Sequence, residues 1–196
     1  MIKIGLTGNI AAGKSFVINI FEDLGIPAVS ADNIVHDLYE HDDFIHNKVV
    51  EIFKNYDIFS ENKIDRKKIG EIIFSNGKIK KELETLLHKE VIKKISDFFD
   101  ENKDKKIAVA EIPLLFENHY ENLFDKIIMV YANDDLRFDR IKKRNNFDDE
   151  YIKKIMNSQL SQDLKREKSD FVIINENKTS DELKKEITKI TENLWY

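Results

Sequence analysis

The sequence predicts an α/β fold in which a parallel five-stranded sheet lies between layers of helices. Two observations support this prediction. Short β-rich runs alternate with segments of helical spacing, an order typical of right-handed βαβ crossovers. Four of the runs are apolar at successive positions, as in strands that are buried on both faces of a parallel sheet. The strands are expected at residues 2–6, 27–29, 107–112, 127–131 and 171–174.

Helical spacing of apolar residues predicts the elements between these strands. Helices are expected at residues 15–24, 78–99, 134–144, 148–168 and 181–194. The segment between the second and third strands is much longer than the others, helical and charged, which favours an inserted substrate domain. A second charged helical stretch separates the fourth and fifth strands and favours a mobile lid.

Composition argues against several classes of partner. The formal net charge is -5, and the 35% of charged residues include both signs interspersed, so we expect no nucleic-acid partner. The absence of cysteine is compatible with a reducing compartment. No run of about 18 apolar residues occurs, and Thr7, Gly8 and Asn9 interrupt the N-terminal apolar stretch, which predicts neither membrane span nor signal peptide. We expect a soluble cytoplasmic protein that is a monomer or weak oligomer.

The strongest motif is a phosphate-binding loop. Residues 8–15 read GNIAAGKS, a complete match to GxxxxGK[ST] between an apolar strand and a helical segment. Glycines allow backbone conformations and a close approach that a Cβ would obstruct, so that amides and the helix N-terminus face phosphate oxygens. We predict ATP binding, with Lys14 on the β- and γ-phosphates and the Ser15 hydroxyl on Mg²⁺. The predicted ATP-binding residues of the loop are Gly8, Asn9, Ala11, Ala12, Gly13, Lys14, Ser15 and Phe16.

This loop indicates a P-loop NTPase three-layer fold, and other features favour a kinase over a GTPase. An NKxD pattern at 62–65 precedes a helical stretch instead of ending a buried strand, and no glycine has the aspartate three positions earlier that DxxG requires. We therefore expect a nucleotide-binding core at residues 1–32, 101–135 and 169–196, a helical substrate-binding insertion at 33–100 and a lid at 136–168.

A kinase also needs a group that orients or deprotonates the acceptor hydroxyl. Asp32 follows the second expected strand, so it would emerge at the carboxyl edge of the sheet beside the phosphate loop, where ligands bind. We predict that Asp32 is the catalytic base. The alternative is that Asp32 caps the next helix, and the two roles are compatible.

Cations are needed to neutralise the transferring phosphoryl group. Arg140 and Arg144 are four residues apart, so on a helix they project from one face and are candidates to grip triphosphate oxygens, with Lys165 and Arg166 nearby. A solvated helix face is the alternative. Glu111 ends the third expected strand and is a candidate to hold a Mg²⁺-bound water, although a simple strand-end turn explains the same pattern.

The motifs resemble those of the dephospho-coenzyme A kinase family over nearly the whole chain. The segments that match the family's order and approximate spacing are GLTGNIAAGKS, LGIPAVSAD, IDRKKIGEIIF, LETLLH, IPLLFE, RIKKR and SDFVIIN. IPLLFE together with an aspartate just after the second strand is distinctive, because few P-loop kinases share both.

The resemblance implies ATP- and Mg²⁺-dependent phosphorylation of the ribose 3'-hydroxyl of dephospho-coenzyme A, the last step of coenzyme A synthesis. It assigns Asp32 as the base, Arg140 and Arg144 as lid arginines, Asn175 to the adenine, and the insertion to coenzyme A binding. Implied substrate-binding residues are Asp32, Arg66, His88, Phe116 and Glu117.

Four positions depart from the family pattern, whereas Lys14, Ser15 and Asp32 are retained. The departures concern nucleotide affinity and the contacts around His88. They are Asn9 for the usual glycine, Phe16 for threonine, Ser30 for the first aspartate of the DAD motif and Lys89 for the proline after His88.

Two other functions stay open from the sequence. Another small kinase, acting on a nucleoside monophosphate or a metabolite, would share the phosphate loop. A regulatory module that hydrolyses ATP slowly would need no acceptor, and the combination of Asp32 with the arginine pair argues against it.

Overall fold

The structure, a computed structural model, describes residues 1–60, 63–144 and 147–194, apart from the side chain of Arg66. The chain divides into two compact units. The first unit contains Met1–Ser30 and Phe99–Tyr196 and holds the large sheet, and the second contains Ala31–Phe98 and is mostly helical. The NKxD match at 62–65 lies partly outside the described residues, and Lys63–Ile64 within it forms a short strand.

The first unit is built on a five-stranded sheet with the order β2-β5-β1-β6-β7, in which every pairing is parallel. All five expected strands are present, which confirms the predicted α/β fold. The central strands are buried at nearly every position, as their unbroken apolar runs predict. The strands are β1 (Ile2–Thr7), β2 (Ala28–Ser30), β5 (Ile107–Glu111), β6 (Lys126–Tyr131) and β7 (Phe171–Ile174).

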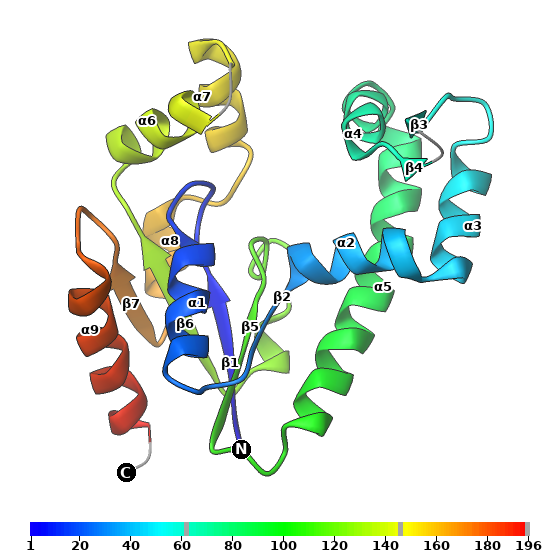
Figure 1. Cartoon of the computed structure of the whole chain (residues 1–196). Coiled ribbons are helices and arrows are strands. Elements are labelled where there is room, and N and C mark those ends of the chain that lie inside the picture. Colours follow the sequence, from blue (N-terminus) through cyan, green and yellow to red (C-terminus); the bar gives the residue numbers. More distant parts are fainter. Residues whose placement is uncertain (61–62, 145–146, 195–196) are drawn as a thin grey trace. The chain divides into compact units, whose positions relative to one another are not determined.

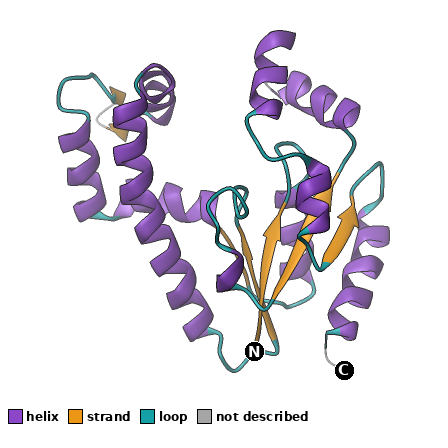
Figure 2. Cartoon of the chain, turned by 180° about the vertical axis from the view of Figure 1, so that it is seen from behind, coloured by secondary structure: helices purple, strands orange, loops and turns teal. Residues whose placement is uncertain are grey.

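Helices cover both faces of this sheet (Figures 1 and 2). Helices α1 (Lys14–Asp23) and α9 (Ser180–Asn193) pack against each other on one face. Helix α8 (Gln162–Glu167) packs on the other face, against β6. Helices α6 (Asp134–Arg144) and α7 (Asp149–Asn157) follow β6 beyond its carboxyl end.

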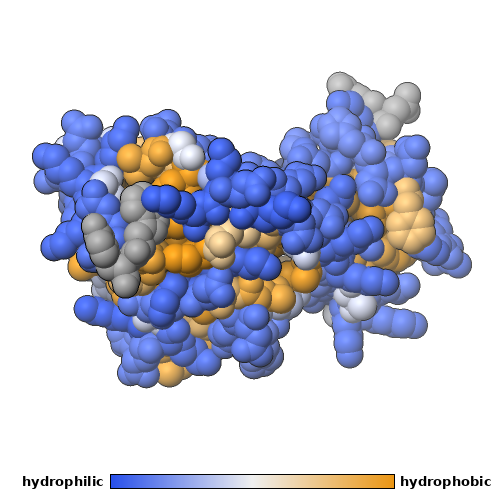
Figure 3. All heavy atoms as spheres, turned by 90° about the horizontal axis from the view of Figure 1, so that it is seen from below, coloured by the Kyte–Doolittle hydropathy of each residue, from blue (hydrophilic) through white to orange (hydrophobic). Residues whose placement is uncertain are grey.

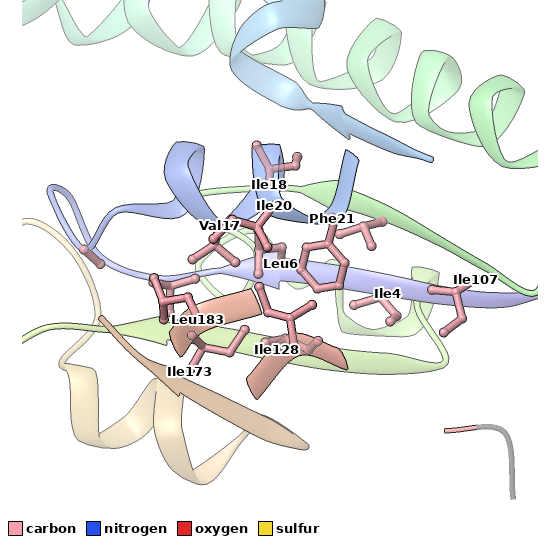
Figure 4. Packing of buried hydrophobic residues seen from close by; sticks show 14 residues of the cluster. Ile4, Leu6, Val17, Ile18, Ile20, Phe21, Ile107, Ile128, Ile173 and Leu183 are labelled. Carbon is pink, nitrogen blue, oxygen red and sulfur yellow. The ribbon is translucent and has the colours of Figure 1, made fainter. Parts of the chain in front are cut away.

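The core of the first unit lies between the sheet and helices α1 and α9 (Figure 4). Aliphatic side chains from strands far apart in the sequence meet there, so burial of apolar surface holds β1 and α1 on either side of the loop that joins them. The fully buried members include Ile4, Leu6, Val17, Phe21, Ile128, Ile173, Leu183 and Ile187.

The stretch expected as one helix over 148–168 forms two helices, α7 and α8, so that prediction was wrong. The break falls at residues 158–161. There the Leu160 N–H donates to Glu117 and the Leu160 carbonyl accepts from Asn9, which are bonds to distant parts of the chain. Ser161 then caps α8 by accepting from the Leu164 N–H. Tertiary hydrogen bonds replace helical ones here, and local periodicity does not predict them.

The second unit has a separate set of buried side chains from its own elements. Asp42 and Asp65 cap its helices α3 and α4 by accepting backbone N–H bonds. A short antiparallel pair of strands, which the sequence did not predict, precedes α4. The elements are α2 (Ala31–His41), α3 (Asp43–Ile52), β3 (Phe59–Ser60), β4 (Lys63–Ile64), α4 (Arg66–Ser75) and most of α5 (Gly77–Glu101).

Hydrophilic side chains dominate the face seen in Figure 3, with smaller areas of hydrophobic residues between them. In the part of the chain that the structure describes, the helices are too short or too polar to cross a lipid bilayer.

Two neighbouring isoleucines of β7 test the packing of the sheet. Ile173 is 0% exposed, so Ile173→Ala should lower the free energy of unfolding by about 2–5 kcal/mol. Ile174 is 38% exposed, so the matched variant Ile174→Ala should cost less than about 1 kcal/mol. Urea unfolding measures both changes. Equal losses would contradict the described burial of β7.

Candidate active site

The phosphate loop joins β1 to α1 at the carboxyl end of the sheet, and two of its positions require glycine. Gly8 has a φ of 149° and Gly13 a φ of 96°. A Cβ on Gly8 would lie 2.4 Å from the Val130 carbonyl oxygen, and a Cβ on Gly13 would lie 2.0 Å from Nδ2 of Asn175. The loop therefore approaches the ends of β6 and β7 more closely than any side chain would permit.

Two arginines of α6 bind the outer side of the loop through its carbonyl groups. Nε of Arg137 donates to the Ile10 carbonyl at 2.9 Å. Nη1 of Arg140 donates to the Ala11 carbonyl at 3.1 Å and to the Ala12 carbonyl at 3.3 Å. Three successive carbonyls are thus held by side chains from outside the loop.

Asn175, the first residue after β7, reinforces this support. Its Nδ2 donates to the Ala12 carbonyl at 2.9 Å, and Asn175 is only 5% exposed. Its own carbonyl accepts from Nη2 of Arg140 at 3.1 Å. Arg140, Asn175 and Ala12 therefore form a closed set of hydrogen bonds.

These outward carbonyls determine where the loop amides point. In a trans peptide the C=O and the following N–H point in opposite directions, so the N–H groups of Ala11, Ala12 and Gly13 face the inside of the loop. The Asn9 carbonyl also faces inward, because it accepts from the Ala12 N–H at 3.1 Å and from Nζ of Lys14 at 3.4 Å. Amides and an ammonium group that converge in this way form an anion-binding concavity.

The N-terminus of α1 adds to the same concavity. Its N-cap residue is Gly13, which offers no side chain to the first-turn N–H groups. By contrast, α3, α4, α7 and α9 each have an aspartate or threonine cap. The side chain of that cap accepts a hydrogen bond from an N–H group in the first turn of its own helix. A ligand anion is therefore the natural acceptor at α1. Lys14 is buried there, whereas Ser15 and Phe16 are exposed.

A buried hydrogen bond links the carboxyl ends of β2 and β5. Ser30 is paired in register with Glu111, and its hydroxyl donates to Oε2 of Glu111 at 2.6 Å. The two residues are 7% and 2% exposed. Ser30 therefore provides a hydrogen-bond donor to the Glu111 carboxylate. The aspartate that the family pattern has at position 30 would instead place a second negative charge beside it.

The turn after β5 contains a buried ion pair with the segment that returns from α7. Nζ of Lys165, a residue that is 0% exposed, lies 2.8 Å from Oε1 of Glu117 and donates to the Pro113 carbonyl at 3.3 Å. Burial lowers the pKa of Lys165, although the hydrogen bond and charge of Glu117 act in the opposite direction. Glu117 also accepts from the Leu160 N–H at 3.0 Å. The neighbouring Phe116 is 2% exposed.

Arg137 is a site residue that the sequence analysis missed. It is 2% exposed, and its Nη1 donates to Oδ1 of Asp134 at 2.7 Å. Burial lowers its pKa, and the charge of Asp134 partly opposes that effect. Its position three residues before Arg140 on a helix is a signal that could have identified it. Arg137 also lines a polar cavity of about 660 Å³ together with Asn9, Tyr131, Asp134, Gln159 and Gln162.

The family model for dephospho-CoA kinase matches residues 2–181. The chain belongs to the dephospho-CoA kinase family. A dephospho-CoA kinase from Bacillus licheniformis is 36% identical over 180 residues, which cover 91% of this chain and 90% of that protein. A solved dephospho-CoA kinase from Campylobacter jejuni is 34% identical, with 98% and 96% of the two chains covered and a TM-score of 0.71. The crystal structure of TT1252 from Thermus thermophilus is 25% identical, with 100% and 98% covered and a TM-score of 0.82.

The other residues that the sequence predicted for the site lie in the second unit or on α6. Asp32 is exposed in the first turn of α2, one residue after the helix begins, so it is not the N-cap of that helix. His88 is half-buried in α5, and the side chain of Arg66 lies outside the described part of the chain. Arg144 is exposed in the last turn of α6, whereas Arg140 is half-buried against the loop.

Removal of the buried ammonium tests the ion pair. Lys165→Met should lower the free energy of unfolding by about 3–5 kcal/mol, because it leaves the Glu117 carboxylate buried without its cation. Lys168→Met is the matched control. It removes an ion pair with Glu121 whose side chains are 52% and 28% exposed, and it should cost less than about 1 kcal/mol.

Guanidinium chloride unfolding measures the two variants. Addition of Glu117→Gln to Lys165→Met should recover part of the loss, because the unpaired charge disappears. A Lys165→Met variant as stable as Lys168→Met would show that the pair is exposed to solvent.

Proposed function

We propose that this protein transfers the γ-phosphoryl group of ATP to the ribose 3'-hydroxyl of dephospho-CoA, giving CoA and ADP in the last step of CoA synthesis. The observation that carries the proposal is the inward ring of loop amides beside Lys14, in a chain whose family match extends over residues 2–181. The amide ring supports triphosphate binding, and the extent of the match supports the acceptor.

The nucleotide is bound by residues 8–16 in this proposal. The inward N–H groups of the loop and the first turn of α1 receive the phosphate oxygens, and Lys14 neutralises the β- and γ-phosphates. Arg140 and Asn175 bind loop carbonyls, which supports a role in keeping the amides inward. The predicted contact of Asn175 with adenine stays a prediction.

Mg²⁺ would accompany the triphosphate, and the exposed Ser15 hydroxyl would be its protein ligand, with Glu111 as the candidate to hold one of its waters. Within the described ranges, no three or more His, Asp or Glu side chains gather into a metal site. That arrangement fits an ion held mainly by phosphate oxygens and water. When bound, the ion offsets negative charge on the bridging and terminal oxygens.

Asp32 acts as the base that receives the proton of the 3'-hydroxyl. The chain leaves the sheet at Ser30, the last residue of β2, and Asp32 follows two residues later as an exposed carboxylate. Ser30 itself bonds to Glu111 at the end of β5, so the start of this connection is held at the carboxyl edge of the sheet. Ligands of open α/β sheets bind at this edge.

Residues 33–100 form the domain that binds dephospho-CoA, with Arg66 and His88 among its contacts. Exposed aromatic side chains in this region, Phe44 at 60% and Phe74 at 62%, provide apolar surface for the uncharged part of the acceptor. Residues 136–168 form a lid that excludes water from the reacting phosphoryl group. The exposed Arg144 is the lid cation that reaches the nucleotide, and Glu117 and Phe116 support the acceptor side from the turn after β5.

The acceptor is tested by mass spectrometry after incubation of the purified protein with ATP, Mg²⁺ and dephospho-CoA. We expect the acceptor to gain one phosphate, because the proposed reaction transfers a single phosphoryl group. Nucleoside monophosphates and an acceptor-free sample are the controls. Faster transfer to a monophosphate, or ADP release that does not depend on any acceptor, would contradict the proposal.

The base is tested by substitution of a carboxylate with its amide. Asp32→Asn should lower kcat by about 10²–10⁴-fold, because the amide cannot accept the proton. Asp37→Asn is the matched control, since Asp37 is also exposed on α2, and its turnover should stay near that of the wild type. Near-normal turnover of Asp32→Asn in the same coupled assay for ADP would exclude Asp32 as the base.

A further inference from the structure

Two hydrogen bonds join the phosphate loop to the segment between α7 and α8. Nδ2 of Asn9, a residue that is 2% exposed, donates to the Leu160 carbonyl at 2.9 Å. The Ile10 N–H donates to Oε1 of Gln159 at 2.8 Å. We call these four residues, Asn9, Ile10, Gln159 and Leu160, the loop clasp.

The clasp is held in place from its other side. The Leu160 N–H donates to Oε1 of Glu117 at 3.0 Å, and the same oxygen pairs with the fully buried Lys165. Both peptide groups that flank Leu160 are therefore bonded to fixed partners, one in the loop and one in the turn after β5. Gln159 is positioned by this support and not by a helix of its own.

One peptide group connects Gln159 to Lys14. The Ile10 N–H, which donates to Gln159, belongs to the same planar peptide unit as the Asn9 carbonyl. The N–H and the carbonyl of this unit point in opposite directions. The Asn9 carbonyl accepts from Nζ of Lys14 at 3.4 Å on the inner side of the loop. Any rotation of this peptide unit that breaks the bond to Gln159 also moves a carbonyl that accepts from the Lys14 ammonium.

Buried polar atoms gather around the clasp. In residues 1–60, 63–144 and 147–194, four side chains have a buried polar atom without a hydrogen-bond partner, and they are Asn9, Glu117, Arg137 and Gln162. Asn9 belongs to the clasp, and Glu117 and Arg137 bond directly to it. Three of the four, Asn9, Arg137 and Gln162, also line the polar cavity of about 660 Å³, so the clasp borders a space that holds water or a polar ligand.

We propose that Gln159 is a positioning residue for ATP binding, which acts through the Ile10–Asn9 peptide group on Lys14, with Asn9 holding the clasp in register. Asn9 stands where the family pattern usually has glycine, which has no side chain to make the bond to Leu160. The inference rests on the proposed function in one respect, that the loop binds ATP.

Calorimetric titration with a non-hydrolysable ATP analogue and Mg²⁺ tests the inference without any acceptor. Gln159→Met keeps the length of the side chain but removes the acceptor oxygen. It should raise the Kd by about five- to tenfold, the effect of one lost hydrogen bond. In the assay with acceptor, KM for ATP should rise by a similar factor, with kcat within about twofold of the wild type.

A double-mutant cycle separates a role through Lys14 from a general structural effect. In a Lys14→Ala background, Gln159→Met should change the Kd by less than about twofold, because the group it acts through is gone. Ser158→Ala is the matched control. Its hydroxyl donates to the Ile155 carbonyl at 2.7 Å, within its own segment, and the variant should bind the analogue as the wild type does.

Asn9→Gly provides a second, independent variant. It should raise the Kd in the same direction and speed amide hydrogen exchange at residues 158–161. An unchanged Kd for Gln159→Met, or the same rise in both the wild-type and the Lys14→Ala backgrounds, would overturn the inference. Failure of the wild type to bind the analogue would instead overturn the proposed function.

Discussion

Three successive carbonyls of the phosphate loop, those of Ile10, Ala11 and Ala12, accept hydrogen bonds from side chains that lie outside the loop. Because peptide groups are planar, these bonds also determine the direction of the amides that follow. The anion-binding character of the loop thus depends on Arg137, Arg140 and Asn175 as well as on its own glycines. Backbone donors whose direction is fixed before the anion binds reduce the reorganisation that binding requires, which favours electrostatic stabilisation.

The same arrangement explains why so much charge is buried at this end of the sheet. Arg137 and Lys165 are almost inaccessible to solvent, and burial lowers the pKa of each. Each keeps a carboxylate partner, Asp134 for Arg137 and Glu117 for Lys165, which limits the cost of desolvation. Apolar side chains would pack there at lower cost, but they could not bind the carbonyls that these cations hold, that of Ile10 in the phosphate loop for Arg137 and that of Pro113 after β5 for Lys165.

Hydrogen bonds also join the phosphate loop to both sides of α7. Arg137 and Arg140 belong to α6, near the start of residues 136–168, and Leu160 lies in the later connection between α7 and α8. Both ends of the segment are bonded to the same loop. The position of the loop and the position of this segment are therefore tied to each other by hydrogen bonds.

The sequence by itself determined the five strands, their parallel arrangement, and the loop with Lys14 and Ser15. These features are local: apolar runs encode buried strands, and the loop needs glycine at Gly8 and Gly13 because no other residue fits their φ angles and close contacts. The sequence also places Asp32 just after β2, and its role as the base stays a prediction. Only the tertiary structure showed the break between α7 and α8, the buried Arg137, and the bonds of Asn9 and Leu160. Arg137 bonds to Ile10 across 127 positions, Asn9 to Leu160 across 151 and Leu160 to Glu117 across 43, and no local pattern of residues records such pairings. Hydrogen bonds between distant segments form because the sheet brings their ends together, so they are consequences of the fold and cannot be read before it is known.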